Sequence, residues 1–426
     1  YSGEDKHNIV VNMKSKISDR LTINLRAQMD RRKIWGAGTA GNGGSGNAGN
    51  SNSRFNRMTA ILMYRPTAGI KGSDSDLLQG EDPMLVDDSG NVMQNPLISA
   101  KEETDDREMR TFNFNGGFTY TLMKGLTFRN TTGYRYYNSR RAKFYGAESM
   151  TAKRSSINGS IDTGENETFQ ISNVLNYSTR IKKRHNISAM LGQEWINNST
   201  RSFGGAADHF PNDDIGLADM SLGTPTKVTS GQNYDNKLLS FFTRVNYNYR
   251  DRYLVSASLR ADGSSKFGAD NKWGWFPAVS AAWRLAEEPF IKKLNVFSDL
   301  KLRVGYGLAG NNRIGSYQSL ALMSAVFTAM GDELVSGYAS MQIPNPQLKW
   351  EANKTFNLGI DLGFFDQRLT ISPEFYINKS SNLLLNAKLP DSAGYSSMIL
   401  NAGRTKNTGI DLTVNSVNIN SHGFTW

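Results

Sequence analysis

The sequence has no cysteine, little proline and no long apolar run. Its 426 residues include no Cys and 11 Pro. Without Cys there is no disulfide, no thiolate nucleophile and no Cys-based metal site. A stretch of 18 or more apolar residues is also missing, which excludes a transmembrane helix. A transmembrane β-barrel gives a far weaker signal per strand, so a mean hydropathy of -0.49 does not establish a soluble protein.

Catalytic, nucleotide and metal motifs are equally scarce. The four His residues are too scattered for a catalytic or metal set. Gly305, Gly307 and Gly310 match G-x-G-x-x-G, but the residues after them continue as loop, where a dinucleotide site needs a helix. The net charge of +10 comes from dispersed basic residues rather than one basic stripe. We therefore expect no enzyme activity, no cofactor, no metal and no nucleic-acid partner.

Aromatic residues and glycine are abundant, with 40 Gly, 17 Tyr, 21 Phe and 7 Trp, a composition typical of β proteins. Residues 238–268 read LLSFFTRVNYNYRDRYLVSASLRADGSSKFG. Apolar and polar residues alternate there on both sides of a short polar break at 250–252. A period of two predicts strands, and the short break predicts an antiparallel hairpin.

The same alternation recurs along the chain and predicts about thirteen strands, with another beginning near Phe424. Tight turns fall near 16–19, 123–125, 181–184, 250–252, 365–367 and 418–423. Long polar segments fall between them, near 33–106, 147–165, 204–236, 311–350 and 383–402. The break at 265–272 is shorter, and 286–298 is the one long member of the tight set. Short and long connections alternate, so we expect the tight turns at one end of the sheet and the long loops at the other.

One segment departs from the strand pattern. Apolar residues recur at helical spacing near 54–65. Counting them as a strand would break the alternation of short and long connections. We therefore expect a short helix inside the long loop 33–106.

The two faces of the predicted strands differ in polarity. Many strands exceed the length of about nine to eleven residues that crosses a bilayer, and buried charges on the polar face would be costly unless paired. We therefore expect an antiparallel transmembrane β-barrel with short periplasmic turns, long extracellular loops and an apolar face toward lipid. The residues expected to face a wet lumen are Arg244, Asn246, Arg260, Asp262, Lys301, Arg303, Asn357, Asp361, Thr370 and Glu374. Those expected to form aromatic girdles are Trp195, Tyr247, Tyr249, Tyr253, Trp273, Trp275 and Trp283.

A sheet in lipid cannot keep open edges, because every backbone N–H and C=O at membrane depth needs a partner. We therefore expect further strands from other parts of a longer polypeptide. We also expect that these residues alone do not refold into a stable monomeric barrel.

Several stretches resemble the barrel of SusC/RagA-type TonB-linked outer-membrane transporters: the hairpin quoted above, WGWFPAVSAAWRLAEEPFI, SDLKLRVGYGLAGNNRIGSY, NPQLKWEANKTFNLGIDLGFFDQRLTISPEFY and GYSSMILNAGRTKNTGIDLTVN. The resemblance implies that residues 1–426 are part of a barrel of roughly 22 strands in the bacterial outer membrane. It also implies an N-terminal plug, which together with the terminal strands is absent here. Such proteins import glycans or peptides with energy from the TonB complex, and a SusD-like surface lipoprotein usually covers them.

Active import is therefore the first hypothesis, with loop residues as ligand contacts. Aromatic faces stack on sugars, and amides supply hydrogen bonds. The candidates are Tyr317, Trp350, Tyr395 and Asn311, although each could instead pack the loops. The alternatives are a passive porin or structural barrel, a TonB-dependent siderophore receptor, and a secreted β-sheet enzyme or adhesin. A glycosidase would need a pair of carboxylates, and no pair stands out.

Overall fold

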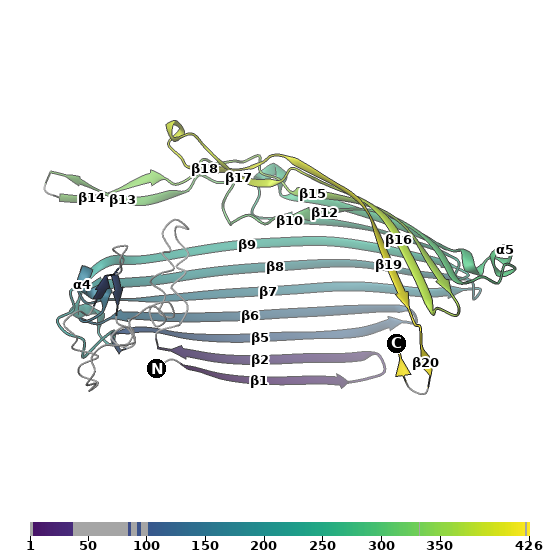
Figure 1. The fold of residues 1–426 in the computed structure, drawn as a ribbon, viewed down its shortest axis with the longest axis horizontal. Coiled ribbons are helices and arrows are strands. Elements are labelled where there is room, and N and C mark those ends of the chain that lie inside the picture. Colours follow the sequence, from purple (N-terminus) through teal and green to yellow (C-terminus); the bar gives the residue numbers. More distant parts are fainter. Residues whose placement is uncertain (1–2, 37–83, 87–91, 95–100, 332, 422–423) are drawn as a thin grey trace.

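One large antiparallel sheet dominates the computed structural model, which describes residues 3–36, 84–86, 92–94, 101–331, 333–421 and 424–426. Its strands are β1 (Gly3–Lys16), β2 (Leu21–Trp35), β5 (Glu103–Met123), β6 (Leu126–Tyr145), β7 (Asn158–Ile181), β8 (His185–Asp208), β9 (Thr224–Tyr249), β10 (Tyr253–Ser264), β11 (Trp273–Arg284), β12 (Phe297–Asn311), β15 (Glu351–Phe364), β16 (Leu369–Ser381) and β19 (Arg404–Ser416). The thirteen strands pair in that order (Figure 1). The number of sheet strands agrees with the sequence prediction.

The remaining elements are small and lie in the connections. Four two-stranded hairpins are formed by β3 (Met84–Val86) with β4 (Val92–Gln94), β13 (Met323–Met330) with β14 (Glu333–Ser340), β17 (Leu384–Lys388) with β18 (Ser397–Asn401), and β20 (Asn420–Ser421) with β21 (Phe424–Thr425). The helical pieces are α4 (Met150–Ser155), α5 (Pro289–Lys292), η2 (Met220–Leu222), η3 (Ala269–Asn271), η4 (Leu285–Glu287) and η5 (Asp391–Ala393). Within the described ranges, no helix is both long and apolar enough to cross a bilayer.

Tight turns and long connections alternate, as the sequence predicts. In Figure 1 the tight turns gather at the right end and the long connections toward the left. The tight turns use left-handed residues, for example Gly125 at φ 83° and Arg250 with Asp251 at φ 53° and 57°. At Gly125 an added Cβ would lie 2.3 Å from the carbonyl oxygen of Ser178, so this turn requires glycine.

Three predicted loop boundaries are wrong, because several strands continue beyond the alternating residues. The loop expected at 204–236 shrinks to 209–223, since β8 and β9 stay paired almost to their ends. The loop expected at 147–165 becomes 146–157, and the strands around 33–106 run to Trp35 and resume at Glu103. Cross-strand hydrogen bonds hold these polar extensions in the sheet. Their sequences lack the alternation of apolar and polar residues on which the strand prediction relied.

Two other loop predictions have different outcomes. The expected 311–350 segment lies between β12 and β15 and also contains the β13–β14 hairpin. The helix expected near 54–65 lies outside the described residues.

The sheet has one apolar face that no described residue covers. Large apolar side chains on it remain exposed, with Ile410 at 74% and Leu191 at 61%. The buried apolar clusters lie instead among the long connections, around Phe144 and Phe210 and around Phe267 and Leu348. The fold therefore packs its loops with its own residues and leaves the flank of the sheet for the membrane.

Candidate functional site

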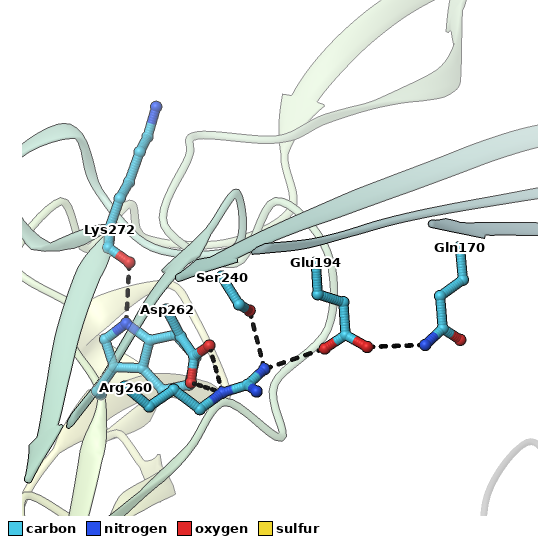
Figure 2. Close-up of polar contacts among 7 residues, drawn as sticks. Gln170, Glu194, Ser240, Arg260, Asp262 and Lys272 are labelled. Atoms are coloured by element: carbon cyan, nitrogen blue, oxygen red, sulfur yellow. Dashed lines mark hydrogen bonds and ion pairs between the residues drawn. The ribbon is translucent and has the colours of Figure 1, made fainter. Parts of the chain in front are cut away.

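The opposite face of the sheet carries polar networks that join several strands. Figure 2 shows one, in which Arg260 on β10 is the centre. Its Nε donates to both carboxylate oxygens of Asp262 at 2.7 and 2.9 Å, and its Nη2 donates to Glu194 at 3.1 Å and to the Ser240 hydroxyl at 2.9 Å. Gln170 on β7 extends the network by donating to Glu194 at 2.8 Å. Four neighbouring strands are thus linked through side chains.

A second network lies on β12, β15 and β16. Arg303 donates through Nε and Nη2 to Asp361 at 2.8 and 3.0 Å, and through Nη1 to Glu374 at 3.1 Å. The Lys301 ammonium lies 3.8 Å from Asp361. Bidentate Arg–carboxylate pairs are among the stronger polar contacts in proteins. Both networks therefore brace the polar face.

Six of the residues predicted to face the lumen, named below, share this polar face. Cross-strand register places Arg244 opposite Ser258, so Arg244 lies on the same face of the sheet as Arg260 and Asp262. Lys301 lies opposite Asp361 on the next pair of strands. Arg303 lies on the same face of β12 as Lys301. Arg244 differs from the others, since it is exposed and makes no ion pair within the described part of the chain. Among the described residues, Arg244 therefore stands outside both ion-pair networks.

The expected aromatic girdle has a clear counterpart at the end with tight turns. Tyr249, Tyr253 and Trp283 stack in sequence across three strands, with ring centroids 6.2 and 6.0 Å apart. Glu288, in the turn beside α5, accepts hydrogen bonds from Tyr253 at 2.8 Å and from the Trp283 indole at 3.2 Å. These hydrogen bonds hold the pKa of Glu288 below its usual value. The girdle is therefore fastened to the turn beneath it.

At the other end, the connections 265–272, 312–350 and 382–403 pack into one unit, with Phe267, Ile314 and Leu348 buried at its centre and Leu384 and Ile399 packed against them. Trp350 completes this core, with its ring 5.2 Å from Phe267 and 5.4 Å from Phe276, and its indole N–H donates to the Lys272 carbonyl at 2.9 Å. Trp350 was predicted as a ligand contact, but its contacts here are those of a packing residue.

Backbone contacts lock the same unit. A Cβ on Gly268 would lie 1.9 Å from the Pro346 carbonyl oxygen, so the two connections touch only because this residue is glycine. The amide of Asn401 donates to the Lys349 carbonyl at 2.8 Å and accepts from the Lys349 N–H at 2.9 Å. The mouth of the sheet is therefore a packed structure over much of its extent.

The other three predicted ligand residues lie apart. The Tyr317 hydroxyl accepts from the Asp235 N–H at 3.1 Å, and its ring stacks on Tyr234 at 6.5 Å. Asn311 ends β12 and accepts from the Arg313 N–H at 3.1 Å. Tyr395 is partly exposed between η5 and β18. Among the described contacts, none joins any of the four candidates to another, so their common role in ligand binding stays a prediction.

The structure also reveals a cavity that the sequence did not suggest. It measures about 290 Å³ and lies at the loop ends of β6 to β9. Its polar lining includes Tyr145, Asn158, Ser160, Asp208 and Thr226. Register brings these side chains together, since Asn158 pairs with Tyr145 on one side and with Asp208 on the other. No sequence motif could have found them, because they come from four different strands.

Acidic residues from three connections meet beside this cavity. Asp213 accepts from the Ala147 N–H at 3.0 Å, and Glu102 accepts from the Glu148 N–H at 3.4 Å. Burial, together with the nearby carboxylates of Asp213 and Glu148, raises the pKa of Glu102. Nowhere in the described ranges do three or more His, Asp or Glu side chains group in a way that could hold a metal ion.

Comparisons with known proteins agree on one family. The sequence profile described as "TonB dependent receptor-like, beta-barrel" matches residues 35–426. TonB-dependent receptor P39 of Formosa agariphila is 31% identical over 96% of this chain and 38% of its own length. TonB-dependent receptor SusC of Bacteroides thetaiotaomicron is 38% identical over 45% of this chain and 20% of its own length.

Solved structures give the same result for the fold. The structure titled "Structure of the RagAB peptide transporter" matches 99% of this chain and 45% of the compared chain, with a TM-score of 0.81 and 23% sequence identity. The chain thus matches less than half the length of each of these relatives.

Proposed function

Because the chain belongs to the TonB-dependent receptor-like β-barrel family of the outer membrane, we infer that it forms part of the wall and mouth of an importer for glycans or peptides, energised through TonB. The family consists of transport receptors rather than enzymes. We assign the long connections to the cell surface and the tight turns to the periplasm. Strands outside this chain would complete the two edges of the sheet.

The observation that carries this proposal is the asymmetry of the sheet. Its polar face is braced by charged networks around Arg260 and Arg303, which suits a wall facing water. At the end with the long connections, side chains pack around Phe267 and Leu348, and a separate cavity of about 290 Å³ lies at the loop ends of β6 to β9. Hydroxyl, amide and carboxylate groups in that cavity match the hydrogen-bonding groups of sugars and of peptide backbones.

A test measures uptake of labelled oligosaccharides and oligopeptides by cells with and without TonB. Import predicts uptake that is lost in both the receptor deletion and the TonB deletion. A passive porin predicts ion conductance and TonB-independent uptake. A siderophore receptor predicts TonB-dependent uptake of ferric chelates alone. Either of the last two results would overturn the proposal.

A SusD-like surface lipoprotein as lid forms part of the same proposal, and the β13–β14 hairpin is the surface that we assign to it. The hairpin protrudes among the long connections (Figure 1) and exposes Tyr338 at 75%, Met330 at 68% and Phe327 at 67%. A lone two-stranded hairpin is marginally stable in water, and an apolar surface of this kind usually marks a protein contact. Its position above the membrane suits a lipoprotein on the cell surface.

Co-purification tests this assignment. The double variant Phe327→Ser and Tyr338→Ser should lose the co-purifying lipoprotein while the receptor stays in the outer membrane. The matched control is Phe365→Ser, which changes an equally exposed apolar residue in a turn at the other end of the sheet. Unchanged recovery of the lipoprotein with the double variant would contradict the docking role of the hairpin.

A further inference from the structure

Three neighbouring tight turns bring exposed cations close together at one end of the sheet. The turns join β5 to β6, β7 to β8 and β9 to β10. Backbone hydrogen bonds tie each turn to the next hairpin, from the Ser178 N–H to the Gly125 carbonyl at 2.8 Å and from the Arg250 N–H to the Arg184 carbonyl at 2.7 Å. The exposed cations of the three turns, here called the turn cations, are Lys124, Lys182, Lys183, Arg184 and Arg250.

Carboxylates do not neutralise the turn cations. The three turns contain a single carboxylate, Asp251, and it accepts a hydrogen bond from the Asn248 amide at 2.6 Å. Arg252, in the same turn, pairs with Glu288 at 3.2 Å. None of the five turn cations makes an ion pair with any residue in the described ranges. This end of the sheet therefore carries a local excess of positive charge.

Two of the turns place charged residues where the backbone disfavours them. The turns Ile181–Arg184 and Tyr249–Arg252 close through N–H···O hydrogen bonds of 3.1 and 3.0 Å. Their central residues have positive φ, 49° and 56° at Lys182 and Lys183, and 53° and 57° at Arg250 and Asp251. Turns of this type I′ geometry favour Asn-Gly, because a left-handed backbone brings Cβ close to the carbonyl oxygen. Backbone strain of this kind concentrates at functional sites.

Aromatic and apolar side chains beside these turns face the lipid. Register places Ile181, His185, Tyr249, Tyr253 and Trp283 in one row across five strands. Tyr253 lies an odd number of residues from Arg260 on β10, so the row is on the face opposite the polar networks. The Arg250 guanidinium lies over the Tyr249 ring, 5.2 Å from its centroid. This turn cation therefore lies against the lipid-facing side of the sheet.

Tyr and Trp rings in such a row are typical of the depth of lipid headgroups. We propose that the turn cations hold the phosphate headgroup of an anionic phospholipid in the periplasmic leaflet of the outer membrane. Phosphate oxygens accept hydrogen bonds from several Lys and Arg groups at once. The acyl chains would lie along exposed apolar residues such as Ile181, and a soluble anion would gain nothing from that face. The inference rests on the assignment of the tight turns to the periplasm, and it does not depend on which ligand is imported.

Lipid titration of the whole purified receptor tests this site. Native mass spectrometry measures binding of phosphatidylglycerol, with zwitterionic phosphatidylcholine for comparison. Each cation near an anionic surface contributes about fivefold to affinity. Lys182→Asn with Lys183→Gly should therefore weaken phosphatidylglycerol binding roughly 25-fold and leave phosphatidylcholine binding unchanged. Because Asn-Gly suits this turn, the variant should resist urea at least as well as the unmodified receptor.

Two controls separate the charge from the turn geometry. Gln367→Gly relaxes a left-handed residue, at φ 66°, in another turn at the same end and leaves the charge unchanged. Lys272→Asn with Lys388→Asn removes two exposed lysines among the long connections. Both controls should bind phosphatidylglycerol as the unmodified receptor does. Lys182→Gln with Lys183→Gln removes the charge from the strained turn, and it decides the question if the Asn-Gly variant fails to fold.

Either of two results would overturn the proposal. The first is equal affinity for phosphatidylglycerol in the unmodified receptor and in a folded double variant at Lys182 and Lys183. The second is binding of glycerol phosphate, which has the charge but no acyl chains, as tightly as phosphatidylglycerol, since that result identifies a site for soluble anions. Neither measurement involves uptake, so a negative result here leaves the import proposal standing, and loss of the import proposal leaves this site to be judged by lipid binding alone.

Discussion

Arg260 and Glu194 lie on strands that are not neighbours, yet their side chains share a hydrogen bond of 3.1 Å. β9 runs between the two strands and contributes Ser240 at the crossing point. Ser240 is fully buried, and its hydroxyl accepts from the same guanidinium group. A small residue at this position lets the arginine reach across an entire strand, which stiffens the wall beyond what backbone pairing provides.

Replacing Arg260 with Met should destabilise the barrel by about 1 to 3 kcal/mol, because Asp262 and Glu194 would lose their shared partner. Urea unfolding in lipid vesicles measures this free energy. Arg244→Met is the matched control, since it removes an exposed arginine of the same face that makes no described ion pair, and should change stability by less than about 0.5 kcal/mol. Equal effects of the two changes would show that the network does not brace the wall.

Trp350→Ala should loosen the mouth rather than weaken ligand binding directly. The change removes the ring from between Phe267 and Phe276, which should cost about 2 to 4 kcal/mol of loop stability. Trp350→Phe keeps most packing, loses only the hydrogen bond to Lys272, and should cost about 1 kcal/mol. Proteolysis of the 382–403 connection reports the effect. If Trp350→Ala lowers ligand affinity and leaves protease resistance unchanged, Trp350 is a ligand contact after all.

The contact between Glu102 and the 146–148 and 209–223 connections should weaken as pH rises. The folded pKa of Glu102 is raised, so its protonated form favours the closed arrangement. This stability is fully present below the ordinary Glu pKa of about 4.3 and is lost as pH passes through the raised value. Hydrogen exchange at the Ala147 amide, corrected for the intrinsic rate, measures it.

Glu102→Gln should remove that pH dependence and keep the amide protected. Asp214→Asn, an exposed carboxyl neighbour of Asp213, is the control and should leave the profile as it is. Protection that stays constant with pH in the unmodified protein would rule out this role for Glu102.

Filling the cavity should reduce ligand affinity if the cavity holds part of the ligand. Ala206 lines it, and Ala206→Leu should weaken binding of the imported glycan or peptide at least tenfold, or about 1.4 kcal/mol. Ala189→Leu makes the same change on the apolar face of the same strand and should not affect binding. Calorimetry on the purified receptor makes the comparison, and unchanged affinity for Ala206→Leu would remove the cavity from the binding site.

Alternation along residues 238–262 was sufficient to predict two strands, their turn and which residues share each face. The upper part of β9 was missed, because residues 224–237 carry no apolar period and are held by pairing with β8. The cavity at Tyr145 and Asp208 was also beyond prediction, since it depends on the register of four strands.

The great length of β7, β8 and β9 restricts how this wall can change during evolution. At 24 to 26 residues, each would extend about 80 Å, so these paired strands continue well beyond the hydrocarbon layer. A single-residue insertion in this part of a strand would move every following side chain to the opposite face of the sheet. Viable insertions and deletions in these strand extensions should therefore involve even numbers of residues or be absorbed by bulges. The connections that follow the strands can change by any number of residues.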